Sequence, residues 1–194
     1  MYYGFILLFS IILGIVDSLI IVEKTVWFVI LAIVISVASV VIIDAIVALI
    51  VRWVYPAKWF SFNKEIYMGK KKECRFYEFL GIKKWKDKIP EWGKATNFRK
   101  NKISDPKNNE YIERYILEAN YGVMIHFLSI ILGFLVIFIL PLKYLLFFGV
   151  PVAIVNGIYN GLSLFILRYN LPKLHQLHRI NEKRAKREEA SLIA

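Results

Sequence analysis

Four long, almost uninterrupted apolar runs dominate the pattern of the chain. They cover residues 3–22, 26–51, 121–141 and 144–167. A helix needs about 20 apolar residues to cross roughly 30 Å of hydrocarbon, and each run meets that length. The pattern therefore predicts an all-α integral membrane protein in which four transmembrane helices form two hairpins. We expect residues 1–194 to be a single membrane domain.

The first run has the position of a signal peptide but not its features. The opening MYYG lacks a basic stretch, and no small-residue cleavage pattern follows Val22. The apolar run is also longer than a signal sequence needs. We therefore expect residues 3–22 to remain as a transmembrane helix.

The basic residues predict the orientation of the chain. Residues 52–120 hold 17 Lys and Arg and residues 168–194 hold seven, whereas the two short connectors hold only Lys24 and Lys143. Because Lys and Arg concentrate on the cytoplasmic side, we expect a multi-pass protein of the cell membrane with both termini cytoplasmic. The net charge of +11 then matches anionic lipid headgroups, and no nucleic-acid partner is needed to explain it.

The predicted cytoplasmic regions are a loop over residues 52–120 and a tail over residues 168–194. Aromatic rings alternate with Lys and Arg through the loop, which is typical of a basic amphipathic segment lying among lipid headgroups. Residues 90–109 contain the turn-forming types Pro, Gly, Asn and Asp. From Glu110 the pattern becomes helical and is expected to run unbroken into the third span. The tail is predicted to form a basic amphipathic helix.

Several chemistries are excluded by what the sequence lacks. A single cysteine, Cys74, forbids an intrachain disulfide and is too few for thiolate-rich metal sites. No Walker A, G-x-G-x-x-G, G-x-S-x-G or H-E-x-x-H motif occurs, and neither does the H-x-x-x-x-D arrangement of glycerol-phosphate acyltransferases. His175 and His178 have metal-ligand spacing, but an amphipathic membrane-surface helix explains them better. We expect no metal and no bound cofactor.

The fourth span carries polar side chains that are costly at membrane depth. Asn156, Tyr159, Asn160 and Ser163 follow an i, i+3, i+4, i+7 pattern, which places them on one helical face. They favour either a functional site or interhelical hydrogen bonding, and the G-x-x-x-G formed by Gly157 and Gly161 would support close helix packing. The residues alone do not separate these two interpretations.

Ionisable partners are offered by the third and second spans. Glu118 and His126 are eight residues apart, about 12 Å of rise and 80° of rotation on an ideal helix, so both can border one cavity. His126 can act as a base if another group orients its second nitrogen; otherwise it is an interfacial histidine. Asp44 can pair with Asn156 or Asn160, stay protonated or act chemically, and pairing is the favoured interpretation.

Three stretches resemble the glycosyl-4,4'-diaponeurosporenoate acyltransferase family, small membrane acyltransferases of staphyloxanthin-type carotenoid synthesis. They are FYEFLGIKKWKDKIPEWG at 76–93, YIERYILEANYGVMIH at 111–126 and RYNLPKLHQLHRI at 168–180. The first has the family's aromatic K-x-W-K core, the second its glutamate and histidine at the same separation, and the third its R-Y-N-x-P motif. Together they cover about a third of the chain in the family's order.

The resemblance implies an acyltransferase that moves a fatty acyl group from a cytosolic thioester donor to a hydroxyl of a glycosylated lipid. The donor is expected to be acyl-CoA or an acyl carrier protein, and the acceptor a glycolipid such as a glycosyl carotenoid. His126 and Glu118 are the expected catalytic residues. The expected substrate-binding residues are Asn156, Tyr159, Asn160, Arg168, Tyr169, Asn170, Lys84, Trp85, Lys86 and Lys173. The alternative is a non-catalytic membrane protein that binds anionic lipid or a partner subunit through its basic inner face.

Overall fold

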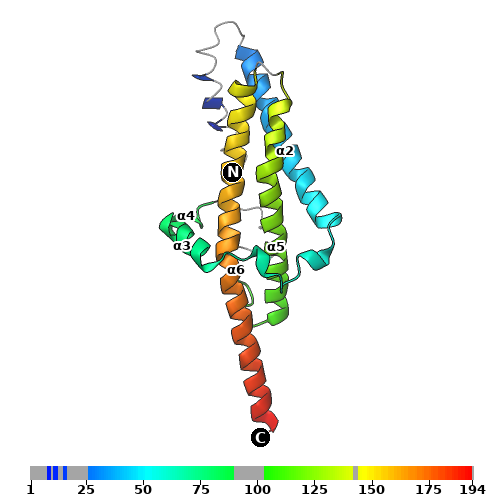
Figure 1. Cartoon of the computed structure of the whole chain (residues 1–194), viewed down its shortest axis with the longest axis vertical. Coiled ribbons are helices and arrows are strands. Elements are labelled where there is room, and N and C mark those ends of the chain that lie inside the picture. The colour runs from blue at the N-terminus through cyan, green and yellow to red at the C-terminus, as the bar shows by residue number, and fades with distance from the viewer. Residues whose placement is uncertain are drawn as a thin grey trace. The chain divides into compact units, whose positions relative to one another are not determined.

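The computed structural model describes residues 8–9, 11–12, 15–16, 26–89, 103–141 and 144–193. All regular structure among these residues is helical (Figure 1). The all-α prediction is therefore confirmed for the part of the chain that the structure describes. Most of the first predicted span, residues 3–22, lies outside the described residues. The same holds for residues 90–102 of the turn region predicted at 90–109. The arrangement of four spans as two hairpins stays a prediction.

Three of the described helices are long and apolar enough to cross a membrane. The first is α2, Val26–Trp53, which matches the span predicted at 26–51. The second is α5, Asn109–Leu132, continued by the 3-10 helix η4, Gly133–Phe138. It begins where a helix was predicted to start and runs without a break into the third apolar run. The third is α6, Val150–Ile193, preceded by the π-helical turn η6, Leu145–Gly149.

The helix α6 differs from the sequence prediction because it does not stop at the end of the fourth apolar run. It is 44 residues long in all, extends to Ile193 and contains Pro172 in its interior. Proline lacks the N–H that would bond to the carbonyl four residues earlier, here that of Arg168. In the structure the backbone N–H of Gly69 donates to that carbonyl at 2.9 Å. A bond from the loop thus replaces the missing helical bond, and span and tail form one helix.

The described residues fall into two compact units. Unit 1 comprises Met1–Val54 and Ile125–Leu162, and unit 2 comprises Tyr55–Met124 and Ser163–Ala194. In unit 1 the helix α2 contacts η4 and η6, and Figure 1 shows these elements side by side. Small and β-branched side chains of α2, such as Ala32, Val37 and Val40, form the core with Val136 and Val152. Isoleucines and leucines cover the outward faces, as a lipid-facing surface requires.

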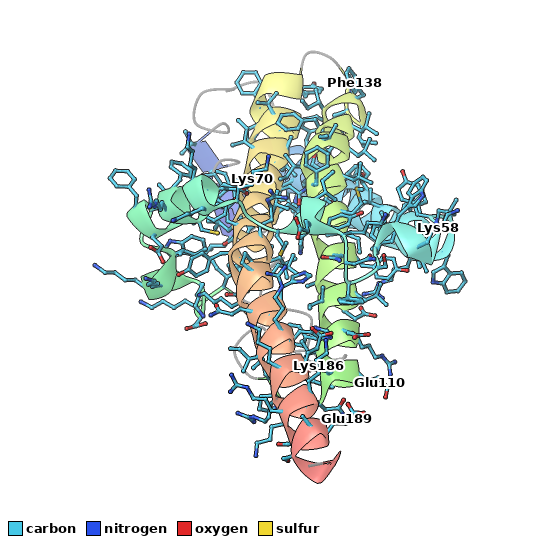
Figure 2. All side chains as sticks on the ribbon, turned by 60° about the horizontal axis from the view of Figure 1, so that its bottom comes forward. Lys58, Lys70, Glu110, Phe138, Lys186 and Glu189 are labelled. Carbon is cyan, nitrogen blue, oxygen red and sulfur yellow. The ribbon has the colours of Figure 1, made fainter. Side chains whose placement is uncertain are left out.

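Unit 2 contains the shorter elements. These are η1 (Ala57–Trp59), η2 (Glu65–Tyr67), α3 (Lys71–Phe79) and α4 (Ile82–Trp85). Gly81 adopts a φ of 71° between α3 and α4, a left-handed conformation that favours glycine. Tyr77 and Ile82 from this pair pack against Ile166 and Tyr169 of α6. Figure 2 shows Lys186 and Glu189 projecting outward from the end of α6, as the charged tail predicts.

The aromatic loop is more folded than a segment lying flat among headgroups. Phe60 and Tyr121 have ring centroids 4.3 Å apart, and Phe60 is fully buried. The Asn120 amide donates to the Phe60 carbonyl at 2.9 Å. The rings of Trp59, Phe76 and Phe79 remain exposed. Some rings that were expected to be half-buried therefore form the protein core of unit 2, and the position of the loop among lipid headgroups stays a prediction.

Candidate active site

The buried polar side chains of unit 1 converge from three different helices. Asp44 lies on α2, His126 on α5, and Asn156 and Asn160 on α6; we call these four residues the Asp44 cluster. Asn156 and Asn160 are buried and Asp44 is 9% exposed, whereas His126 is partly exposed. Each of the three candidate spans thus contributes to one polar group, as a functional site in a helical bundle requires.

The hydrogen bonds of the Asp44 cluster form a chain from carboxylate to imidazole. The amide of Asn160 donates to Asp44 Oδ2 at 3.2 Å, and that of Asn156 donates to Asp44 Oδ1 at 3.4 Å. The Asn160 nitrogen also lies 3.1 Å from Asn156 Oδ1 and 3.2 Å from its backbone oxygen. At the other end, Asn160 Oδ1 lies 2.8 Å from Nδ1 of His126. The predicted pairing of Asp44 with these asparagines is confirmed.

The glycine that permits this packing is not one of those singled out in the sequence. A Cβ at Gly133 would lie 2.5 Å from the Asn156 amide nitrogen, whereas a Cβ at Gly161 would meet nothing within 4 Å among the described residues. At Gly157 the nearest atom is a Phe134 ring carbon at 3.9 Å. The expectation that Gly157 and Gly161 allow close helix packing is therefore not met within the described residues, where Gly133 has this role.

His126 is held by one ring nitrogen only. Nδ1 is engaged by Asn160, and Nε2 has no hydrogen-bond partner among the described residues. A group that orients the second nitrogen is what a histidine base requires. In the structure the Asn160 amide oxygen makes this contact with Nδ1. Glu118 is half-buried on α5 and belongs to unit 2, so its predicted role is untested.

In unit 2 the side chain of Arg168 uses every N–H it has. Nε and one terminal nitrogen donate to the two carboxylate oxygens of Glu73 at 2.5 and 2.8 Å. The remaining donors reach the carbonyls of Ile66, Tyr67 and Met68 at 3.1, 3.4 and 3.2 Å. We call Arg168, Glu73 and the segment 66–69 the Arg168 clamp. Since five donors meet five acceptors, this guanidinium has no donor left for a ligand.

The Arg168 clamp also gives a physical reason for the arginine and proline of R-Y-N-L-P. Pro172 leaves the Arg168 carbonyl open to Gly69, and a Cβ at Gly69 would lie 2.7 Å from that oxygen. The side chain of the same arginine binds the carbonyls just before Gly69. Backbone and side chain of one residue therefore attach the loop to α6. Sequence reasoning missed Glu73, for which the only local signal is an acid in the first turn of α3.

The Arg168 clamp favours the charged form of Glu73, and we therefore expect the protein to lose stability in acid. The hydrogen bond from Arg168 holds the pKa of Glu73 at about 2, below its ordinary 4.5. A carboxylate whose pKa is depressed in the folded state stabilises above its unfolded pKa, and that stability disappears as the pH falls through the folded value. Melting temperature in detergent is therefore expected to fall between about pH 4.5 and 2. Glu73→Gln should flatten that part of the curve; an unchanged acid slope in this variant would contradict the assignment.

The remaining predicted ligand residues of unit 2 form a basic and aromatic group beside the clamp. Tyr169 donates to Glu78 at 2.8 Å, and Lys83 pairs with the same carboxylate at 2.8 Å. The Lys173 ammonium lies 3.8 Å from the centroid of the Tyr169 ring. Lys84 is exposed. Other contacts made by predicted ligand residues are Trp85 Nε1 to the Leu80 carbonyl at 3.0 Å and Lys86 to Asp87 at 2.9 Å.

Two further predicted residues, Tyr159 and Asn170, lie on α6. Tyr159 is half-buried and packs against the core of unit 1, and Asn170 is half-buried on α6. Among the described residues no group of three or more His, Cys, Asp or Glu side chains has the geometry to hold a metal ion.

Three membrane-length helices that enclose a carboxylate, two amides and an imidazole define a helical membrane-type protein with a candidate acid-base site. A family model described as glycosyl-4,4'-diaponeurosporenoate acyltransferase matches residues 56–180. That match covers well over half of the 194 residues. The chain therefore belongs to this family of acyltransferases, which confirms the resemblance seen in the three motifs. Searches of curated proteins and of solved structures find no match to the chain.

Proposed function

We propose that the protein transfers a fatty acyl group from a thioester donor to a hydroxyl of a glycosylated lipid such as a glycosyl carotenoid. The family supports acyl transfer in carotenoid synthesis. The observation that carries the chemistry is the 2.8 Å contact between His126 Nδ1 and Asn160 Oδ1, because it gives the only histidine of the Asp44 cluster a fixed orientation. We propose that the protein is a multi-pass cell-membrane protein with both termini cytoplasmic. A cytosolic donor would then meet the lipid acceptor at the cytoplasmic surface of the membrane.

The proposed reaction is direct transfer. Nε2 of His126 accepts the proton of the sugar hydroxyl while that oxygen attacks the thioester carbonyl. Collapse of the tetrahedral intermediate breaks the carbon–sulfur bond, and the departing thiolate takes the proton back from the imidazolium. The products are an ester and a free thiol, so no oxidant, reductant or cofactor is needed. Tyr159, next to Asn160 on α6, is the hydroxyl we propose as a hydrogen-bond donor to the oxyanion.

Two features of unit 2 argue against an acyl-cysteine intermediate and against Arg168 as a donor to the oxyanion. Burial raises the pKa of the Cys74 thiol, and Sγ lies 3.4 Å from the Gly69 carbonyl. A thiol held in its protonated form is a poor nucleophile, so an acyl-cysteine is disfavoured. Because the donors of Arg168 are all occupied, we propose that this residue holds the loop and does not bind the oxyanion.

We propose that the donor's phosphate groups bind to the basic side chains Lys84, Lys86 and Lys173. Trp85, Tyr169 and Asn170 complete this proposed binding surface, with Trp85 as an interface anchor or a ring that stacks on the sugar. Attraction between exposed charges is screened by salt. The apparent affinity for acyl-CoA should therefore fall as ionic strength rises.

Glu118 is expected to contribute to the reaction through its charge or its hydrogen bonds to the sugar. Glu118→Gln keeps the shape of the side chain and removes the charge, so we expect kcat/KM to fall by roughly tenfold or more, the effect of losing one hydrogen bond to a charged group. Initial rates of acyl transfer in isolated membranes measure this. Glu110→Gln, a change at an exposed glutamate eight residues earlier on α5, is the matched control. Full activity of Glu118→Gln would remove Glu118 from the mechanism.

The proposed function is tested by lipid analysis after expression in a host that makes a glycosyl carotenoid. Cells are fed an isotope-labelled fatty acid, and the extracted lipids are analysed by mass spectrometry. We expect a new labelled ester of the glycosyl carotenoid that is absent from cells carrying the empty vector. The alternative, a non-catalytic protein that binds anionic lipid through its basic residues, predicts identical lipid profiles in the two strains.

A further inference from the structure

We propose that Asp44 is a positioning residue that sets the protonation pattern of the His126 ring through the Asn160 amide. Asp44 itself has no contact with His126 among the hydrogen bonds of the structure; Asn160 contacts both. The inference rests on the proposed function in one respect, that His126 serves as the base. Its structural part concerns which ring nitrogen carries the proton, and this can be measured without any assay of activity.

The first step is the orientation of the amides. Each oxygen of Asp44 faces one asparagine: Oδ1 receives the Asn156 amide at 3.4 Å and Oδ2 the Asn160 amide at 3.2 Å. A carboxylate can only accept hydrogen bonds, so the NH₂ groups must face it. Turning Asn160 over would bring its carbonyl oxygen against the carboxylate in a buried site, where an unpaired polar contact costs most. The Asn160 carbonyl therefore points away from Asp44.

The second step fixes the imidazole. Asn160 Oδ1, directed away from Asp44, lies 2.8 Å from His126 Nδ1. An amide oxygen cannot donate, so Nδ1 must carry the hydrogen of this bond, and Nε2 of the neutral ring keeps its lone pair. Nε2 is then the nitrogen able to take a proton from a hydroxyl. With the Asn160 amide reversed, the ring would instead hold its proton on Nε2 and lose that ability.

The side-chain amides of Asn156 and Asn160 must also be held in place, because they can orient the His126 ring only if they cannot rotate. Asn156 is fully buried, and its amide fills the space left by Gly133, where a Cβ would come within 2.5 Å. The Asn160 nitrogen is held by the backbone oxygen of Asn156 as well as by Asp44. A cluster used only for helix packing would need no defined ring tautomer.

The test reads the tautomer directly in protein labelled with ¹⁵N-histidine and reconstituted in lipid bilayers. The chain has three histidines, and a background with His175→Gln and His178→Gln leaves His126 as the single signal. At a pH where the ring is neutral, solid-state NMR should find Nδ1 protonated and Nε2 unprotonated. Asp44→Asn offers Asn160 a donor as well as an acceptor, so a substantial Nε2-protonated population should appear. Asp105→Asn, an exposed acid in unit 2, should leave the spectrum unchanged.

A second pair of variants disturbs the chain sterically without changing its polar groups. Gly133→Ala pushes on the Asn156 amide and should also broaden or shift the His126 signals, whereas Gly157→Ala, with its nearest atom at 3.9 Å, should not. In membranes, Asp44→Asn should lower kcat at least about tenfold while KM changes less than about threefold, because ground-state binding does not use Nε2.

The outcomes separate the inference from the proposed function. A wild-type ring protonated on Nε2, or an Asp44→Asn spectrum identical to wild type, would overturn the positioning role whatever the activity. If the spectra are as predicted but His126→Ala keeps full activity, Asp44 and Asn160 do orient the ring, but His126 is not the base. The role of Asp44 in catalysis would then be refuted together with the proposed mechanism.

Discussion

His126→Ala is expected to lower kcat for acyl transfer by about 10²- to 10⁴-fold, the range typical of losing a general base. The variant keeps Asp44, Asn156 and Asn160, so the buried carboxylate retains both amide donors. The loss should therefore come from the missing proton acceptor and not from collapse of unit 1. Initial rates with saturating donor in proteoliposomes give kcat, and a melting curve in detergent checks that the variant is folded.

The matched control for this variant is a histidine outside the Asp44 cluster. His175→Gln changes a half-buried histidine of α6 in unit 2 and should leave kcat within about twofold of wild type. A folded His126→Ala variant with wild-type kcat would contradict the mechanism, because no other histidine is available to replace the base in unit 1.

Arg168→Ala should produce the largest loss of stability among single changes in unit 2. It removes five hydrogen bonds and leaves the Glu73 carboxylate without its cation. The side chains of Arg168 and Glu73 are 21% and 27% exposed, so their exposure lies between that of a buried ion pair and that of a surface ion pair. We therefore expect a cost of about 2 to 4 kcal/mol, equivalent to a fall of roughly 5 to 15 °C in the melting temperature of a chain this size.

Arg168→Lys should restore little of that stability, because a lysine ammonium cannot donate to the carboxylate and three carbonyls at once as the planar guanidinium does. The control lies on the same helix: Arg179 is 3.9 Å from Glu65, and both side chains are more than 70% exposed. Arg179→Ala should change the melting temperature by no more than about 3 °C. Equal effects of Arg168→Ala and Arg179→Ala would contradict the clamp.

The sequence predicted those features that depend on local pattern. Long apolar runs located α2 and the apolar parts of α5 and α6, and the switch to a helical pattern at Glu110 located the start of α5 within one residue. The shared face of Asn156 and Asn160 follows from helical geometry, and their buried polarity made Asp44 the natural partner. Local spacing and the cost of unpaired polar groups in hydrocarbon were sufficient for these inferences.

Features that depend on distant contacts could not be predicted from the sequence. Glu73 and Arg168 are 95 positions apart, and no local rule links an acid in the first turn of a short helix to an arginine at the end of an apolar run. A second long-range contact, from the Gly69 N–H to the Arg168 carbonyl, supplies the hydrogen bond that Pro172 cannot make within α6. Gly133 was overlooked because glycines are judged by their spacing within one helix, whereas its importance comes from Asn156 on another.

The most direct test of the proposed acyl transfer uses the purified chain in lipid bilayers with an isotope-labelled acyl-CoA and a glycosyl carotenoid. Mass spectrometry of the extracted lipid detects any new ester, and the free thiol released is measured in parallel. We predict one labelled ester per thiol released with the wild-type chain and essentially none with His126→Ala. A wild-type chain that is folded in the bilayer and forms no ester from either acyl-CoA or an acylated carrier protein would contradict it.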